Sequence, residues 1–130
     1  MDRALIHFTL DREISVGIYL EQMGYYTPDL LHKAAPRLDP ASPGRCVVGF
    51  CAVHQPLVTD LVAPPPVGWD GWGFEEWDAY FGWNNGTYLV DLPQMAVRQY
   101  HPVSIHRRGR TVRCDLSRTP RPLRVVVSNA

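Results

Sequence analysis

The chain is poor in cysteine, in lysine and in long apolar runs. It has three cysteines and a single lysine among 130 residues. An odd number of cysteines cannot all pair within one chain, and without a CxxC pair they do not indicate a zinc site. No apolar stretch reaches the ~20 residues of a membrane span. The first apolar run is interrupted at His7 and again by 11–13, which is not typical of a secretory signal. We therefore expect a cytoplasmic protein without membrane contact, in which three cysteines are free packing residues: Cys46, Cys51 and Cys114.

Recognisable catalytic motifs are missing as well. The five histidines are scattered, and they are not accompanied by a metalloprotease, nucleophile-elbow, Walker or dinucleotide-binding motif. Cys51 and His54 lie three residues apart, and on a strand they would point to opposite faces, which disfavours a thiolate pair. The sequence thus predicts no catalytic residue, no metal and no cofactor, and it favours a protein that is not an enzyme.

Size and composition indicate one compact domain over 1–130. The mass is 14.7 kDa, 45% of the residues are hydrophobic and 11% are aromatic. A chain of this length buries over ~65% of its extended surface, so it needs neither disulfides nor a metal to form a core. Within this domain we distinguish an aromatic and glycine-rich loop at 64–86 and an arginine-rich hairpin and strand at 98–130.

The formal charge of zero hides a segregation along the chain. Residues 1–97 carry five basic and twelve acidic side chains, whereas residues 98–130 carry eight arginines and one acid, Asp115. Opposite charges on the two parts indicate a polyanion contact, an internal docking of acid on base, or an interface with a charged partner.

Apolar periodicity predicts mostly strands. Alternation over 4–10 and again over 14–20 predicts a half-buried hairpin with a loop at 11–13, although a helix from 14 to 23 competes. The continuous apolar run 46–54 is typical of a central strand. Further strands are expected at 57–63, 87–92 and 123–128, with short helices at 27–35 and 75–81. The predicted fold class is mainly β (α+β with one or two short helices), an antiparallel β-sandwich or a partly closed barrel.

A hairpin after Pro102 would carry the clustered arginines. With Arg108 and Gly109 as its turn, Ile105 lies opposite Val112 and Val103 lies opposite Cys114. Arginines at the tip and on the polar face could bind a polyanion, although positive charge also guards a sheet edge against aggregation. The possible polyanion-binding residues are Arg107, Arg108, Arg110 and Arg113.

All four tryptophans fall in the aromatic and glycine-rich loop, together with four acids and no basic residue. Tryptophan and tyrosine dominate interface energetics, and carboxylates would meet basic groups of a partner. The competing interpretation is a lid over the core, because large aromatic side chains are more often packed than displayed. The predicted partner-binding residues are Trp69, Asp70, Trp72, Glu75, Glu76, Trp77, Asp78 and Trp83.

These features favour a small non-enzymatic domain whose partner is another, basic protein. An inhibitor or immunity-type protein that masks a basic site would use acids and rings in this way. One alternative is a small enzyme or ligand-binding protein that uses the tryptophan-rich loop. A second alternative is a nucleic-acid-binding accessory domain that uses the C-terminal arginines, although the neutral overall charge lowers its weight.

Overall fold

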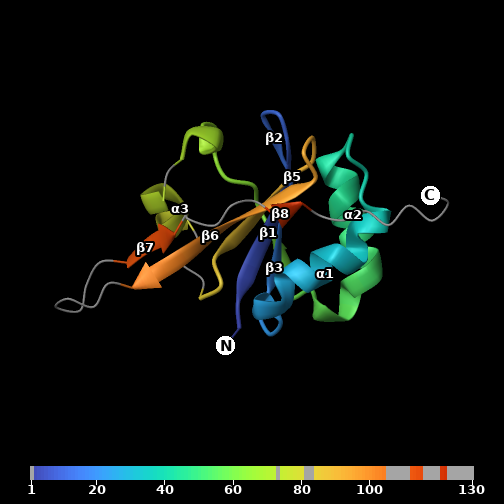
Figure 1. The fold of residues 1–130 in the computed structure, drawn as a ribbon, viewed down its shortest axis with the longest axis horizontal. Coiled ribbons are helices and arrows are strands. Elements are labelled where there is room, and N and C mark those ends of the chain that lie inside the picture. The colour runs from blue at the N-terminus through green and yellow to red at the C-terminus, as the bar shows by residue number, and fades with distance from the viewer. Residues whose placement is uncertain (1, 73, 81–83, 105–111, 116–120, 123–130) are drawn as a thin grey trace.

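The computed structural model describes residues 2–72, 74–80, 84–104, 112–115 and 121–122 (Figure 1). Its strands follow the order β4-β3-β1-β5-β6-β7, with β2 paired to β1 and β8 paired to β6. The strands are β1 (Ala4–Leu10), β2 (Glu13–Ile14), β3 (Gly17–Leu20), β4 (Asp60–Val62), β5 (Thr87–Asp91), β6 (Ala96–Ser104), β7 (Val112–Asp115) and β8 (Arg121–Pro122). The helices are α1 (Thr27–Ala34), α2 (Pro43–His54) and α3 (Phe74–Tyr80), with 3-10 turns η1 (Gly24–Tyr26), η2 (Ala35–Arg37), η3 (Gln55–Leu57) and η4 (Trp69–Gly71).

The prediction of a mainly β fold with one or two short helices, built as an antiparallel sandwich or a partly closed barrel, is wrong. The fold is α+β. Over the described ranges the strands form one open, mixed sheet, in which β1 and β5 run parallel and the other pairs are antiparallel. A parallel pair needs a long crossover connection. Here that connection contains all three helices, and Figure 1 shows α1 and α2 together on one side, away from α3.

Helix α2 stands where a central strand was predicted at 46–54. Ser42 is its N-cap, and the Ser42 side chain accepts a hydrogen bond from the amide of Arg45 at 3.1 Å, while Pro43 fills the first helical position. Both are helix-start signals. The helix has apolar residues on its exposed side as well as on its buried side, for example Val48 and Phe50. The sequence therefore shows no clear helical period.

Strand β1 is central and is buried on both faces, not half-buried as predicted. Its even-numbered side chains belong to the larger of two hydrophobic cores, and its odd-numbered side chains lie on the opposite face of the sheet. The predicted β1/β3 hairpin is confirmed, with Ile6 opposite Ile18. The predicted single strand over 14–20 is divided. Leu10 pairs with Glu13, and an extra residue near Ser15 shifts the register by one residue before Ile6 pairs with Ile18. This is a β-bulge.

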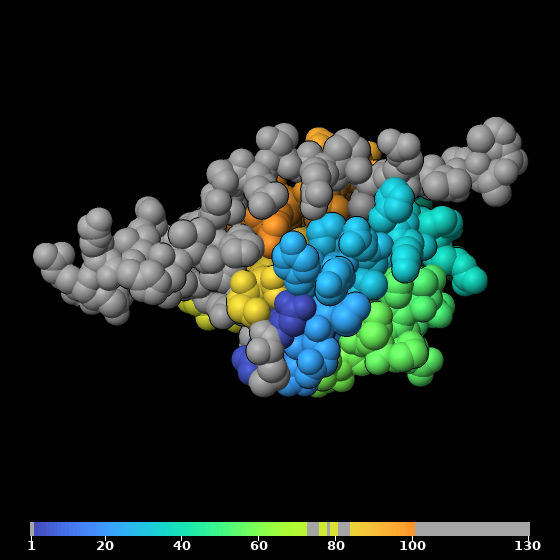
Figure 2. All heavy atoms as spheres, turned by 60° about the horizontal axis from the view of Figure 1, so that its bottom comes forward, coloured from blue at the N-terminus to red at the C-terminus, as the bar shows by residue number. Residues whose placement is uncertain are grey.

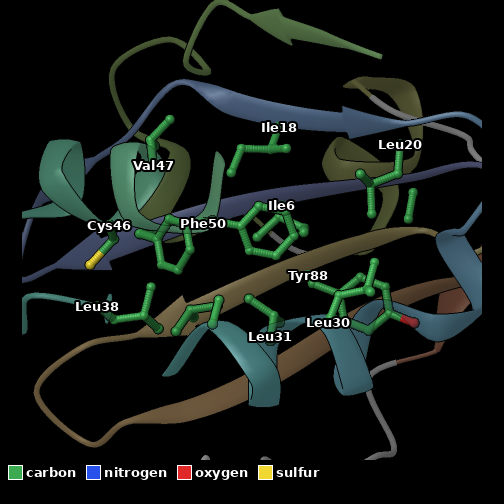
Figure 3. Close-up of a cluster of buried hydrophobic side chains, with 14 of the residues drawn as sticks. Ile6, Ile18, Leu20, Leu30, Leu31, Leu38, Cys46, Val47, Phe50 and Tyr88 are labelled. Atoms are coloured by element: carbon green, nitrogen blue, oxygen red, sulfur yellow. The ribbon is translucent and has the colours of Figure 1, made fainter. Parts of the chain in front are cut away.

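The larger core lies between the sheet and the helix pair α1/α2. Figure 3 shows Leu31 and Phe50 directed from these helices toward Ile6 and Tyr88 on the sheet. The glycine at 49 allows this packing, because a Cβ there would collide with the carbonyl oxygen of Arg37. On the outside, the N-terminal segment lies beside the residues that precede β5 (Figure 2), and the amide of Asn85 donates to the Arg3 carbonyl at 3.0 Å.

The remaining elements agree in part with expectation. The helices predicted at 27–35 and 75–81 correspond to α1 and α3, and β5 and β4 lie within the predicted strands at 87–92 and 57–63. The predicted hairpin register is wrong, because Val103 lies opposite Arg113 and not Cys114. Its turn, and the strand predicted at 123–128, lie outside the described residues. None of the helices in the described ranges is both long and apolar enough to cross a bilayer.

Candidate functional site

The face of the sheet opposite α1 and α2, here called the second face, carries an aromatic cluster built by α3 and η4. Trp77 is only 1% exposed, and its ring lies 5.3 Å from that of Tyr100 on β6 and 4.8 Å from that of Trp72. Trp69 and Tyr80 pack at its edges in T-shaped contacts. Trp72 and Trp69 are half-buried. The tryptophan-rich loop is therefore, in good part, a lid that forms a second and smaller core.

His7 lies beneath this lid on β1. The residue is fully buried, its ring centroid is 6.4 Å from that of Trp77, and a Cβ on Gly17 would come within 2.8 Å of its Cε1 atom. His7 Nδ1 is 2.8 Å from the carbonyl oxygen of Ser15 in the bulge. A carbonyl only accepts, so Nδ1 carries the proton. Burial lowers the pKa of His7 from 6.5 to about 4, an effect that the bond to Ser15 partly opposes, and the imidazole is neutral at pH 7.

Beside the lid, the same face of the sheet is hollowed into an open pocket of about 380 Å³. Its floor comes from β1, β5 and β6, its sides from η4 and from the β1–β2 and β5–β6 turns. The lining residues are Thr9, Asp11, Trp69, Asp70, Leu89, Asp91, Pro93, Gln94, Ala96, Arg98 and Tyr100. We call this pocket the acidic hollow, because three of its four charged residues are aspartates.

Three separate segments, a turn, a 3-10 turn and a strand end, bring the aspartates together. Asp11 has φ 54° in the tight turn between β1 and β2, a conformation that aspartate tolerates better than most residues. Asp70 follows Gly68, whose φ of 95° starts η4. Asp91 ends β5, where its side chain accepts the amide of Gln94 at a long 3.4 Å. None of these positions is near another in sequence, so the acidic hollow exists only in the folded chain.

Among the described side chains, the negative charge of the acidic hollow is only partly balanced. Asp70 lies 3.6 Å from Arg12, but the Arg12 side chain is 88% exposed and the Asp70 side chain 39%. An exposed pair of this kind contributes little free energy. Arg98 is exposed, and within the described ranges it forms no ion pair with Asp11 or Asp91. The lining therefore carries three carboxylates against one guanidinium.

The structure brings together part of the predicted partner-binding set. Trp69 and Asp70 line the acidic hollow, Trp72 and Trp77 belong to the lid, and Glu76 is exposed on α3. Glu75 and Asp78 lie in α3, but their side chains are outside the description, and so is the whole of Trp83. The sequence did not single out Asp11 or Asp91, and it assigned Arg98 and Tyr100 to the arginine-rich segment 98–130 and not to this site.

The predicted polyanion-binding arginines receive little structural description. Arg107, Arg108 and Arg110 lie outside the described residues, and Arg113 is placed only as part of the backbone of β7. A polyanion site at the hairpin stays a prediction.

Cysteine and metal chemistry find no support among the described side chains. Among them, no three His, Cys, Asp or Glu side chains are placed so that they could hold one metal ion. The strand-based argument about Cys51 and His54 is wrong, because α2 places residues i and i+3 on one side. Burial nevertheless raises the pKa of the Cys51 thiol, and His54 Nε2 lies 2.8 Å from the Leu30 carbonyl oxygen. A reactive thiolate requires the opposite shift.

Comparisons with known proteins identify no relative, since no protein family, curated protein or solved structure matches this chain. Function must therefore be argued from the acidic hollow and the lid beside it. Both lie on the second face of the sheet, and Trp69 and Tyr100 belong to both.

Proposed function

We propose that this protein is a small non-enzymatic binding domain whose partner is a basic protein, and that the acidic hollow is the centre of the contact surface. The observation that carries the proposal is the convergence of Asp11, Asp70 and Asp91 on one hollow beside the half-buried indole of Trp69. A concave site lined by one sign of charge attracts the opposite sign and speeds association.

The lid supports such a surface mechanically. Trp77 is held between the rings of Trp72 and Tyr100, so the neighbouring Trp69 rests on a packed base. Aromatic anchors in interfaces are typically rigid and partly buried, because little conformational entropy is then lost on binding. The burial of Trp77 makes it a support for the surface, while Trp69 and the acids are the groups that a partner would reach.

A partner with a basic functional cleft would be masked by this surface. Carboxylates at the hollow would pair with its cationic groups, and the protein would then act as an inhibitor or immunity-type protein. Such complexes depend strongly on salt, because opposite charges steer the encounter.

Affinity capture with paired variants tests the proposal. Asp70→Asn with Asp91→Asn removes two charges from the acidic hollow, and Asp29→Asn with Asp60→Asn removes two exposed charges elsewhere. Proteins captured from a cell lysate by the immobilised wild type are identified by mass spectrometry and tested again, once purified, against both variants. We expect a basic partner whose binding weakens by more than tenfold with the first variant only.

Equal binding of the purified partner to both variants would contradict the proposal. Capture of an acidic partner would contradict it as well. Loss of binding with both variants would show that total charge matters and the hollow does not.

A second function is favoured by the size of the acidic hollow. Small-molecule sites typically occupy about 300–1,000 Å³, and the hollow of about 380 Å³ falls in that range. Trp69 in its lining would report a bound metabolite by a change in fluorescence. A saturable response in a metabolite panel, with no protein partner, would favour this ligand-binding alternative.

A further inference from the structure

The acidic hollow has the composition of a socket for one planar cationic side chain. Its floor residues Leu89 and Ala96 are apolar and belong to paired strands, while Tyr100, 7% exposed, and half-buried Trp69 supply aromatic surface. Carboxylates join the lining from three segments, the β1–β2 turn, η4 and the end of β5. We propose that the acidic hollow receives a single arginine side chain of the partner protein, an inference that rests on the proposed function.

Charge selects a cation. Three aspartates and one arginine line the acidic hollow, so an inserted anion would meet net repulsion. The long contact from the Gln94 amide leaves most of the accepting capacity of Asp91 unused, since a carboxylate offers about four acceptor sites. Asp11 lines the same space from the neighbouring β1–β2 turn. An added cation would thus find carboxylates that the described side chains neutralise only in part.

Shape and aromatic surface select a guanidinium over an ammonium. A guanidinium is flat, stacks on aromatic faces, and donates two parallel hydrogen bonds to one carboxylate. Half-buried Trp69 provides the main aromatic surface, since Tyr100 is 7% exposed and packs against Trp77, and Asp91 provides a carboxylate in the lining. The three-carbon stem of arginine would cover Leu89 and Ala96, as such stems do on apolar surface. Lysine would gain the charge contact but not the stacking.

A change at Arg98 is expected to affect binding in the opposite direction to a change at the aspartates. Among the described residues, Arg98 carries the one positive charge in the lining of the acidic hollow, so it opposes a cationic occupant. Removing it should strengthen the binding of a cation. If the occupant were instead zwitterionic or anionic, Arg98 would be its anchor and the same change would weaken binding.

The experiment uses a small probe and needs no partner. N-acetyl-arginine amide carries the guanidinium without free terminal charges, and N-acetyl-citrulline amide is its neutral isostere. Each is titrated into the full chain labelled with ¹⁵N, and backbone and indole signals are followed by NMR. We expect binding near Kd ~1 mM for the arginine probe, with shifts at Trp69, Asp91 and Tyr100, and no saturable shift with the citrulline probe.

Three variants complete the design. Asp91→Asn should weaken binding of the arginine probe by about fivefold, as expected for loss of one ion pair at a partly exposed site. Arg98→Gln should tighten it by a factor of about two to five for the same reason. Asp29→Asn on α1, outside the acidic hollow, should leave it unchanged. Unchanged spectra elsewhere show that each variant is folded.

The outcomes separate this inference from the proposed function. Equal responses to both probes, shifts confined to other surfaces, or weaker binding with Arg98→Gln would overturn the arginine socket. If one of these results is found but a basic partner still requires Asp70 and Asp91 for binding, the arginine socket is wrong and the proposed function is retained. An arginine probe that binds as expected, with a partner that ignores both aspartates, would overturn the proposed function and keep the socket.

Discussion

Acidification should destabilise the fold through His7, and the size of the effect follows from its burial. The imidazole has a folded pKa of about 4 against 6.5 for an ordinary histidine. The unfolded chain therefore binds a proton that the folded chain does not, at every pH between these two values. Stability contributed by neutral His7 is complete above pH 6.5 and is lost as the pH falls toward 4. The full loss is about 3 kcal/mol, and about 2 kcal/mol of it is gone at about pH 5.

Urea unfolding of wild type and His7→Asn measures this contribution. Asparagine places an amide nitrogen near the position of Nδ1, so the bond to the Ser15 carbonyl can persist while the titration disappears. We expect the difference in unfolding free energy between the two proteins to shrink by about 2 kcal/mol from about pH 7 to about pH 5. Carboxylates that titrate in both proteins cancel in this comparison.

A difference that stays constant within about 0.5 kcal/mol over the same range would refute the reasoning. It would mean that His7 is protonated in the fold or is reached by water. NMR titration of the His7 ring would then show a folded-state pKa near the ordinary value.

Three further predictions concern packing. Gly49→Ala should destabilise the protein by about 1–3 kcal/mol, because its Cβ would collide with the Arg37 carbonyl. Gly44→Ala, on the same helix but with open space around it, should be neutral or stabilise the protein by up to about 1 kcal/mol. Urea unfolding compares the two variants. Trp77→Ala should cost about 3–5 kcal/mol, and a cost below about 1 kcal/mol in the same assay would contradict its role as the centre of the lid. Burial raises the pKa of the Cys46 thiol to about 11, so peptide mapping should find it unmodified by iodoacetamide at about pH 8 until urea unfolds the chain.

Local signals in the sequence predicted the elements that depend on local order. Alternation over 4–10 and the turn after it predicted the β1/β3 hairpin. The helix predicted at 27–35 corresponds to α1, whose first turn holds proline and Asp29. The run 46–54 misled because its apolar residues suit a strand and a buried helix equally well. The cap at Ser42 and Pro43 was the signal that distinguished them.

The candidate site was only half visible for a different reason. Trp69 and Asp70 stood out by composition, whereas Asp11 and Asp91 are ordinary turn and strand-end residues in the sequence. They meet because Thr9 on β1 pairs with Asp91 on β5. Nothing in a single sequence indicates a parallel pairing between distant strands, and an all-antiparallel sheet would have placed these residues apart.

The same parallel pairing bears on how the chain reaches its fold. Thr9 donates its hydroxyl proton to the carbonyl of Val90, 81 residues away, and β1 is the middle strand from which both halves of the sheet extend. Contacts of such high separation slow folding, because a long loop must close before they form. During synthesis the hairpin and α1/α2 would emerge with one edge of β1 uncovered until β5 leaves the ribosome. A chain stopped before residue 87 would keep that apolar edge open, and open edges recruit other strands; such fragments should aggregate where the whole chain does not.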